Sequence, residues 1–164
     1  MRVVWVVVWG ACSAAVAADP GRGPRVYLSD SVARSAVELA ILGAEHRLRR
    51  PDCRLVFTDF ADESVVTALE ATGLQPAEYL VERIWFVDGS DSPQCVKAGE
   101  TALFTEAGSK VVRVCADRFV KLAHRRRAAE ILIIHEALHT LGLGENPPSS
   151  ADITSRVTRR CGGS

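Results

Sequence analysis

The sequence predicts an α+β fold, a compact domain in which a small mixed or antiparallel sheet lies against a backing helix and a second long helix. Two observations lead to this prediction. Several short segments have strand-like composition and are bounded by turn residues, and two longer segments show the apolar periodicity of helices. A length of 164 residues with 48% hydrophobic content suits one domain with a modest core.

The N-terminal segment, residues 1–17, has the pattern of a secretory signal peptide. Arg2 precedes an apolar run at 3–9, and small residues follow as far as Ala17 and Ala18, where we expect cleavage. A retained N-terminal anchor is the alternative. No later segment approaches about 20 consecutive apolar residues, so we expect a mature domain at 18–164 with no membrane span, secreted or periplasmic.

The cysteines agree with an oxidising compartment. Cys12 lies in the predicted signal peptide, and removing it leaves an even number of cysteines, which favours two disulfides. Three pairings are possible. We favour Cys95 with Cys115, because they flank a predicted hairpin, and this pairing leaves Cys53 for Cys161. The wide spacing of the four argues against a cysteine zinc cluster.

The first half of the domain is expected to alternate helices and strands. Ser29 or Asp30 can cap the first helix, the backing helix, and Gly73 can end the second. In chain order, we predict a helix at 31–48, a strand at 54–58, a helix at 63–71 and a strand at 82–87.

A hairpin and a long buried helix follow. Strands at 101–104 and 111–115 flank a polar, glycine-containing turn, so they should pair antiparallel. A helix is then predicted from about 117 to 141. Its second half is almost wholly apolar, and buried polar groups need partners to offset their desolvation. The polar exceptions in that half are Glu130, His135, Glu136, His139 and Thr140.

His135-Glu136-Ala137-Leu138-His139 carries the predicted chemistry. The two histidines lie one turn apart on one helix face, where both can bind a single zinc ion at about 2.0–2.1 Å. Glu136 lies about 100° further round the helix, where its carboxylate can reach a water on the metal's open side. The pattern predicts His135 and His139 as ligands and Glu136 as general base. The alternative is a metal-free core in which carboxylates or backbone carbonyls pair with the histidines.

Glu145 is the predicted third ligand. Gly142 can adopt positive φ and end the helix, and Gly144 adds further freedom, so the chain can bring Glu145 back to the metal. Two histidines and one glutamate form an established catalytic zinc set. Asp152 is the competing ligand, although its spacing from Ser149 fits the capping box of a last helix that runs to about residue 160.

Segment 135–145 resembles the zincin metallopeptidases. Its spacing is similar to the extended metzincin motif H-E-x-x-H-x-x-G-x-x-H, with Glu145 at the place of the third histidine. The run 140–150, and the order of a cysteine-bearing strand followed by this helix, resemble short secreted bacterial zincin-like proteins. The chain departs from metzincins in lacking a methionine turn, since its only methionine is Met1.

This resemblance implies a zincin-like domain that holds one catalytic Zn2+ ion and acts on a protein or peptide. It also implies that the substrate adds as an antiparallel strand along a sheet edge, at 101–104 or 111–113. The implied roles are those of metal ligand for His135 and His139, general base for Glu136, and third ligand for Glu145.

The predicted function is therefore that of a zinc-dependent peptide-bond hydrolase, an endopeptidase. Lys+Arg and Asp+Glu both number 20, so no net charge favours a nucleic acid. Two alternatives stay open: a secreted, disulfide-stapled binding module with a structural or vestigial zinc, and a hydrolase of a non-protein amide such as a cell-wall cross-link. The sequence makes no prediction of oligomeric state.

Overall fold

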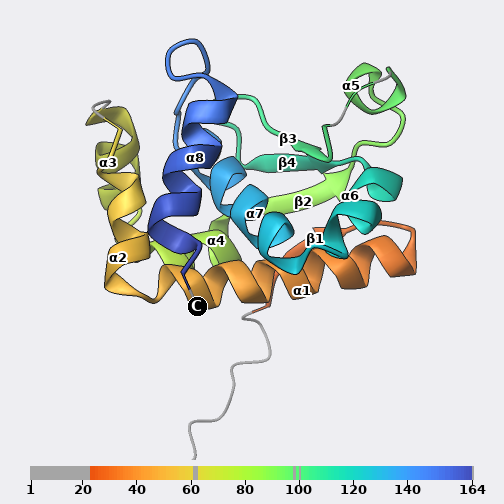
Figure 1. Ribbon diagram of the computed structural model, residues 1–164, viewed down its shortest axis with the longest axis horizontal. Coiled ribbons are helices and arrows are strands. Elements are labelled where there is room, and N and C mark those ends of the chain that lie inside the picture. Colours follow the sequence, from red (N-terminus) through yellow and green to blue (C-terminus); the bar gives the residue numbers. More distant parts are fainter. Residues whose placement is uncertain (1–22, 61–62, 98, 100, 164) are drawn as a thin grey trace, which may run out of the picture.

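A mixed four-stranded sheet lies at the centre of the computed structural model, which describes residues 23–60, 63–97, 99 and 101–163 (Figure 1). The strand order is β1-β2-β4-β3, in which the first three strands are parallel and β3 is antiparallel to β4. The strands are β1 (Arg25–Tyr27), β2 (Trp85–Asp88), β3 (Leu103–Phe104) and β4 (Val111–Val114). The α+β prediction is confirmed, whereas the predicted signal peptide lies outside the described residues.

Side chains alternate across this sheet. Phe86 and Val112, which are register partners on β2 and β4, are buried against the helices. Trp85 and Arg113, on the same two strands, are exposed. The alternation of strand side chains thus buries one face of the sheet under helices and leaves the other face open.

Helix α1 (Ser31–Leu48) is the predicted backing helix, and it runs the length of the molecule in Figure 1. The Asp30 carboxylate caps it by accepting a hydrogen bond from the Ala33 amide at 2.7 Å. The helix packs against α4, α6 and α7 through its buried stripe, which consists of Ala33, Val37, Ala40, Ile41, Ala44 and Leu48.

The other helices include a correction to the predicted strand at 54–58. That segment is helical, because Pro51 at the first helical position starts α2 and a 3-10 turn, η1, follows it. The bounds are α2 (Pro51–Arg54), η1 (Leu55–Phe57), α3 (Glu63–Glu70), α4 (Pro76–Arg83), α5 (Pro93–Val96), α6 (Ala116–Ala123), α7 (Arg126–Thr140) and α8 (Ser150–Cys161).

Two further predictions need adjusted bounds. The strand predicted at 82–87 begins later, at Trp85, because Pro76 and a Gln75–Glu78 capping box start a helix that continues to Arg83. The single helix predicted from 117 to 141 is divided between α6 and α7. Its break lies at 124–125 and lets both helices pack against α1. The helix at 63–71 and the antiparallel hairpin are confirmed.

Two disulfides join distant parts of the chain, with the favoured pairing. Cys53–Cys161 connects α2 to the last residue of α8, and Cys95–Cys115 connects α5 to the end of β4. Within the described ranges, no helix combines the length and apolar character needed to span a bilayer.

Ion pairs complete the packing of α7 and α8. Glu130 is buried on α7, where its carboxylate accepts from Arg47 at 2.6 Å and from Arg126 at 2.9 Å. On α8, Arg160 makes a two-pronged pair with Asp59, at 2.6 and 2.7 Å. The Arg160 guanidinium holds the pKa of the Asp59 carboxyl below its usual range. Glu130 is therefore a structural group, separate from the histidines further along α7.

Candidate metal centre

The two histidines of α7 face each other at its C-terminal end. Both are buried, and their Nε2 atoms lie 2.9 Å apart. Side chains four residues apart share one face of a helix, and here that face lines a cleft beside β3. The structure therefore brings together the two predicted nitrogen ligands.

Glu145 joins them from the loop after α7. Gly142 adopts φ +105°, as expected for the residue that reverses the chain at the helix end. A Glu145 carboxylate oxygen then lies 3.4 Å from Nε2 of His139 and 3.8 Å from Nε2 of His135. One ligand atom from each residue falls within 4.8 Å of the others, although the Glu145 side chain stays 43% exposed.

Asp152, the competing ligand, caps α8 instead. Its carboxylate accepts a hydrogen bond from the Ser149 hydroxyl at 2.7 Å, and that hydroxyl accepts from the Asp152 amide at 3.2 Å. The Asp152 amide bond and a bond from the Ser149 amide to the Asp152 carboxylate, at 3.4 Å, form the predicted capping box. The two hydrogen bonds from Ser149 to the carboxylate hold the pKa of Asp152 below its usual value. The Asp152 side chain thus caps the start of α8 and does not join the two histidines.

Each imidazole is held through its other nitrogen. Nδ1 of His139 lies 2.6 Å from the carbonyl oxygen of Leu143, which can only accept, so in the neutral ring Nδ1 donates and Nε2 carries a lone pair. Nδ1 of His135 lies 2.9 Å from the Thr154 hydroxyl on α8. When it donates there, the Nε2 lone pair of His135 also faces the site.

A cation fits this arrangement. Burial, and secondarily His139, lowers the pKa of His135 to about 3, so its ring is neutral at physiological pH. Two facing lone pairs and a carboxylate repel one another unless a positive charge lies among them. A metal ion supplies that charge, and two nitrogens with one carboxylate oxygen match a catalytic zinc set. Without a metal, the same contact is a hydrogen bond between the two Nε2 atoms.

Glu136 faces the same cleft and lacks a complete set of partners. Its Oε2 is buried and makes no hydrogen bond with any described residue. Burial raises the pKa of Glu136 to about 7, and the Glu145 charge adds to this rise. The Thr105 hydroxyl lowers that pKa but does not reach good hydrogen-bond geometry. The carboxyl can thus exchange a proton near neutral pH.

The cleft has a volume of about 820 Å3 and runs between α7 and the outer strand β3. Its lining includes Leu103, Phe104 and Thr105, together with the histidines, Glu136 and Glu145. Because β4 lies inside the sheet and β3 at its edge, only the first of the two predicted edges, 101–104, is open beside the site.

The C-terminal end of α7 is anchored by neighbouring groups. The Gly108 amide, in the hairpin turn, donates to the carbonyl of His139 at 2.8 Å. Lys110 Nζ donates to the carbonyl of Thr140 at 2.7 Å and to the Tyr79 hydroxyl at 2.8 Å. The Lys110 bond satisfies a carbonyl that a helix end leaves unpaired, and the three bonds together fix the histidine-bearing turn against the sheet.

Sequence reasoning identified the three clustered residues and Glu136, but it missed the groups that orient them. Thr154 and the Leu143 carbonyl hold the two rings, and Thr105 approaches Glu136. No local pattern marks Thr154 or Thr105, because each acts through a contact created by the tertiary fold, whereas the Leu143 carbonyl lies only four residues beyond His139, in the turn after α7. Comparison with models of known protein families, with curated proteins and with solved structures finds no match to this chain.

Proposed function

We propose that the chain is a zinc-dependent peptide-bond hydrolase, an endopeptidase. The observation that carries the proposal is the convergence of His135, His139 and Glu145 beside Glu136 in one open cleft. Several independent features of the sequence lead there: the helical spacing, the glycine turn and the buried carboxylate. A site built only for packing would not leave Oε2 of Glu136 buried and unpaired.

His135, His139 and Glu145 would hold the metal. A zinc ion bound there would act as a Lewis acid and lower the pKa of water toward about 7. Glu136 would take the proton of the attacking water and then deliver it to the leaving amine, which are the two proton transfers that peptide hydrolysis needs. Thr154 and the Leu143 carbonyl would keep the two imidazoles turned toward the metal.

The position of β3 at the edge of the sheet supports the proposal that the substrate is an extended peptide. It pairs with β4 on one side only, so its other edge can pair with a peptide backbone. Phe104 and Thr105 line the cleft beside that edge. A peptide added to β3 would pass close to Glu136, which favours a polypeptide over a small amide.

Two disulfides are compatible with an oxidising compartment, and we propose a secreted or periplasmic location. The same disulfides support the second candidate, a stapled binding module that keeps a structural or vestigial zinc. A hydrolase of a non-protein amide, such as a cell-wall cross-link, is the third. The role of Glu136 distinguishes the binding module from both hydrolases, because a binding module needs no general base.

The experiment is the Glu136→Gln variant. Zinc content should equal that of the wild type, since Glu136 is not a ligand, while cleavage of a peptide library should be lost. Equal cleavage by the two forms would contradict the assigned base. Zinc binding without cleavage of peptides by the wild type would favour the binding module, and cleavage of cell-wall fragments alone would favour the third candidate.

A further inference from the structure

A second cavity adjoins the metal-site cleft. It has a volume of about 950 Å3, and its walls come from α6, the start of α7 and α8. Ala102, Leu132 and Thr154 line both spaces. Thr154 is also the residue that holds His135. A chain bound in the cleft can therefore continue past Thr154 into the second cavity without leaving the surface.

Basic side chains surround this second cavity, which we call the basic cavity. No carboxylate is among the described residues of its lining. The cationic members are Arg118, Lys121, Arg125, Arg126 and Arg127. This charge contrasts with the cleft, whose ionisable carboxylates are Glu136 and Glu145. The chain is neutral overall, so the imbalance is local.

Two of the five cations already have partners. Arg126 pairs with Glu130, and Arg118 donates to backbone carbonyls of the segment before β3. The side chains of Lys121, Arg125 and Arg127 make no hydrogen bond or ion pair with any residue that the structure describes. The basic cavity thus holds three positive charges that can bind an anionic group without breaking an existing contact.

The floor between the cations and the histidines is apolar. On α7 it consists of Ala128, Ile131 and Leu132, which follow Arg127 and precede His135, so it can receive the backbone and apolar side chains of a peptide but offers no charge of its own. The anionic group should therefore lie at the far end of the basic cavity, next to Arg125 and Arg127.

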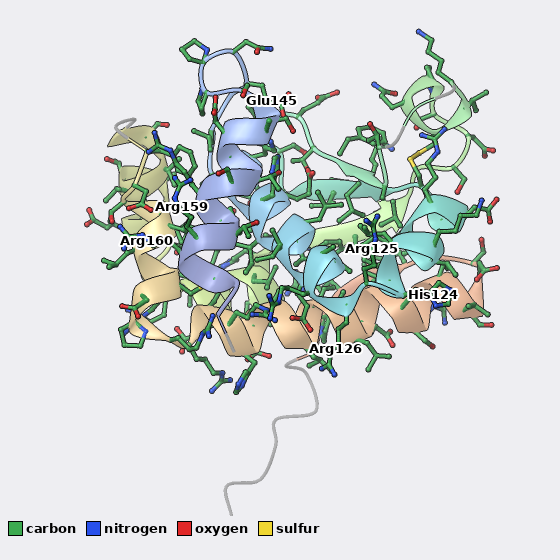
Figure 2. All side chains as sticks on the ribbon, in the orientation of Figure 1. His124, Arg125, Arg126, Glu145, Arg159 and Arg160 are labelled. Atoms are coloured by element: carbon green, nitrogen blue, oxygen red, sulfur yellow. A yellow bond between two sulfur atoms is a disulfide. The ribbon has the colours of Figure 1, made fainter. Side chains whose placement is uncertain are left out.

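Helix α7 sets the distance between the cations of the basic cavity and the histidines of the metal centre. His135 follows Arg127 by eight residues on α7, which corresponds to roughly 12 Å at about 1.5 Å per residue. In Figure 2, Glu145 lies near the C-terminal end of α7, and Arg125 and Arg126 lie near its N-terminal end. An extended peptide covers that distance with about four residues at about 3.3 Å each.

We propose that the basic cavity is a substrate subsite for an acidic side chain, about four residues from the bond that is hydrolysed. This inference rests on the proposed function, because it assumes that a peptide lies in the cleft. The substrate class is then a polypeptide with Asp or Glu at that distance from the cleavage point.

Binding is measured first, on the zinc-loaded Glu136→Gln variant, so that no turnover is needed. Peptide libraries with one position fixed as Glu, Gln or Lys compete with a fluorescent peptide in an anisotropy assay. We expect the Glu library to bind about tenfold more tightly than the Gln library, as for a few exposed ion pairs, with the Lys library weakest. Adding Arg125→Gln and Arg127→Gln together should remove the preference for Glu.

Arg159→Gln is the matched control, because Arg159 is exposed on α8, bonds Ser155 and does not line the basic cavity. It removes one positive charge, as each of the two substitutions in the basic cavity does, and should keep the full preference. Equal binding of the three libraries, or a preference for Glu that survives the double substitution, would overturn the inference. A preference that Arg159→Gln also removes would indicate general attraction and would overturn it too.

Cleavage by the wild type tests the proposed function separately. Cleavage of some libraries without a preference for Glu would keep the hydrolase and reject the subsite. Tight, Arg125- and Arg127-dependent binding of the Glu library without any cleavage would keep the acidic-peptide site and reject the hydrolase. Where cleavage occurs, kcat/KM should be highest with Glu about four residues from the cut bond and should fall when Glu is moved next to it.

Discussion

Replacing Thr154 with valine should weaken zinc binding without touching a ligand. Thr154 holds Nδ1 of His135 at 2.9 Å, and valine keeps the shape of threonine while it removes the hydroxyl. Loss of a partner that orients a ligand histidine costs about 10- to 100-fold in metal affinity. Because Thr154 is exposed, water can replace part of the bond, so we expect about tenfold, or about 1.4 kcal/mol. That value agrees with the net worth of one hydrogen bond, about 0.5–1.5 kcal/mol.

The assay is competition for zinc between the protein and a chromophoric chelator at pH 7. Thr154→Ser keeps the hydroxyl and should restore near-wild-type affinity. Thr158→Val is the matched control, since it makes the same change one turn along α8, in the same basic cavity, away from the histidines. If Thr154→Val and Thr158→Val bound zinc equally well, the role given to the Thr154 hydroxyl would be wrong.

Three further predictions concern packing, pH and the third ligand. Gly43→Ala should lower the free energy of unfolding, measured in urea, by about 1–3 kcal/mol, because the new Cβ would overlap the Glu130 carboxylate that two arginines hold. A gain in stability, usual for Gly→Ala in a helix, would refute this predicted overlap. Asp59→Asn should lower the melting temperature at pH 7. Because the folded-state pKa of Asp59 is depressed, its contribution to stability is present above about pH 4 and is lost as pH falls through that lower pKa. The melting temperatures of the two proteins should therefore converge in acid, and a difference that stays constant with pH would contradict the assignment. Glu145→Ala should sharply reduce zinc stoichiometry measured by mass spectrometry, whereas Asp152→Ala should leave it unchanged, and the reverse result would exchange their roles.

The site was predictable from sequence where local rules apply. The spacing of His135 and His139 places both on one helix face whatever the rest of the fold does, and Gly142 marks the turn that returns Glu145. The Ser149–Asp152 capping box is equally local, and it decides between the two candidate carboxylates. Most of the metal centre could therefore be predicted from short-range geometry.

The fold was predictable only where periodicity was long or turn signals were clear. The short apolar run at 55–57 suits a strand or a helical turn equally well, and Pro51 together with the Cys53 disulfide selects the helical turn. The break between α6 and α7 depends on packing against α1, which no window of sequence contains. The contact of Thr154 with His135 and the basic cavity are not predictable from sequence for the same reason, since both form only where separate helices meet.

Zinc content of the folded protein is the decisive measurement for the proposed metal centre. The chain would be purified with both disulfides formed, dialysed against excess zinc, freed of unbound metal and measured by mass spectrometry beside its His139→Ala variant. We expect one zinc ion for each wild-type chain and a large loss in the variant. A wild-type chain that stays free of zinc, or a variant that binds as much as the wild type, would contradict it.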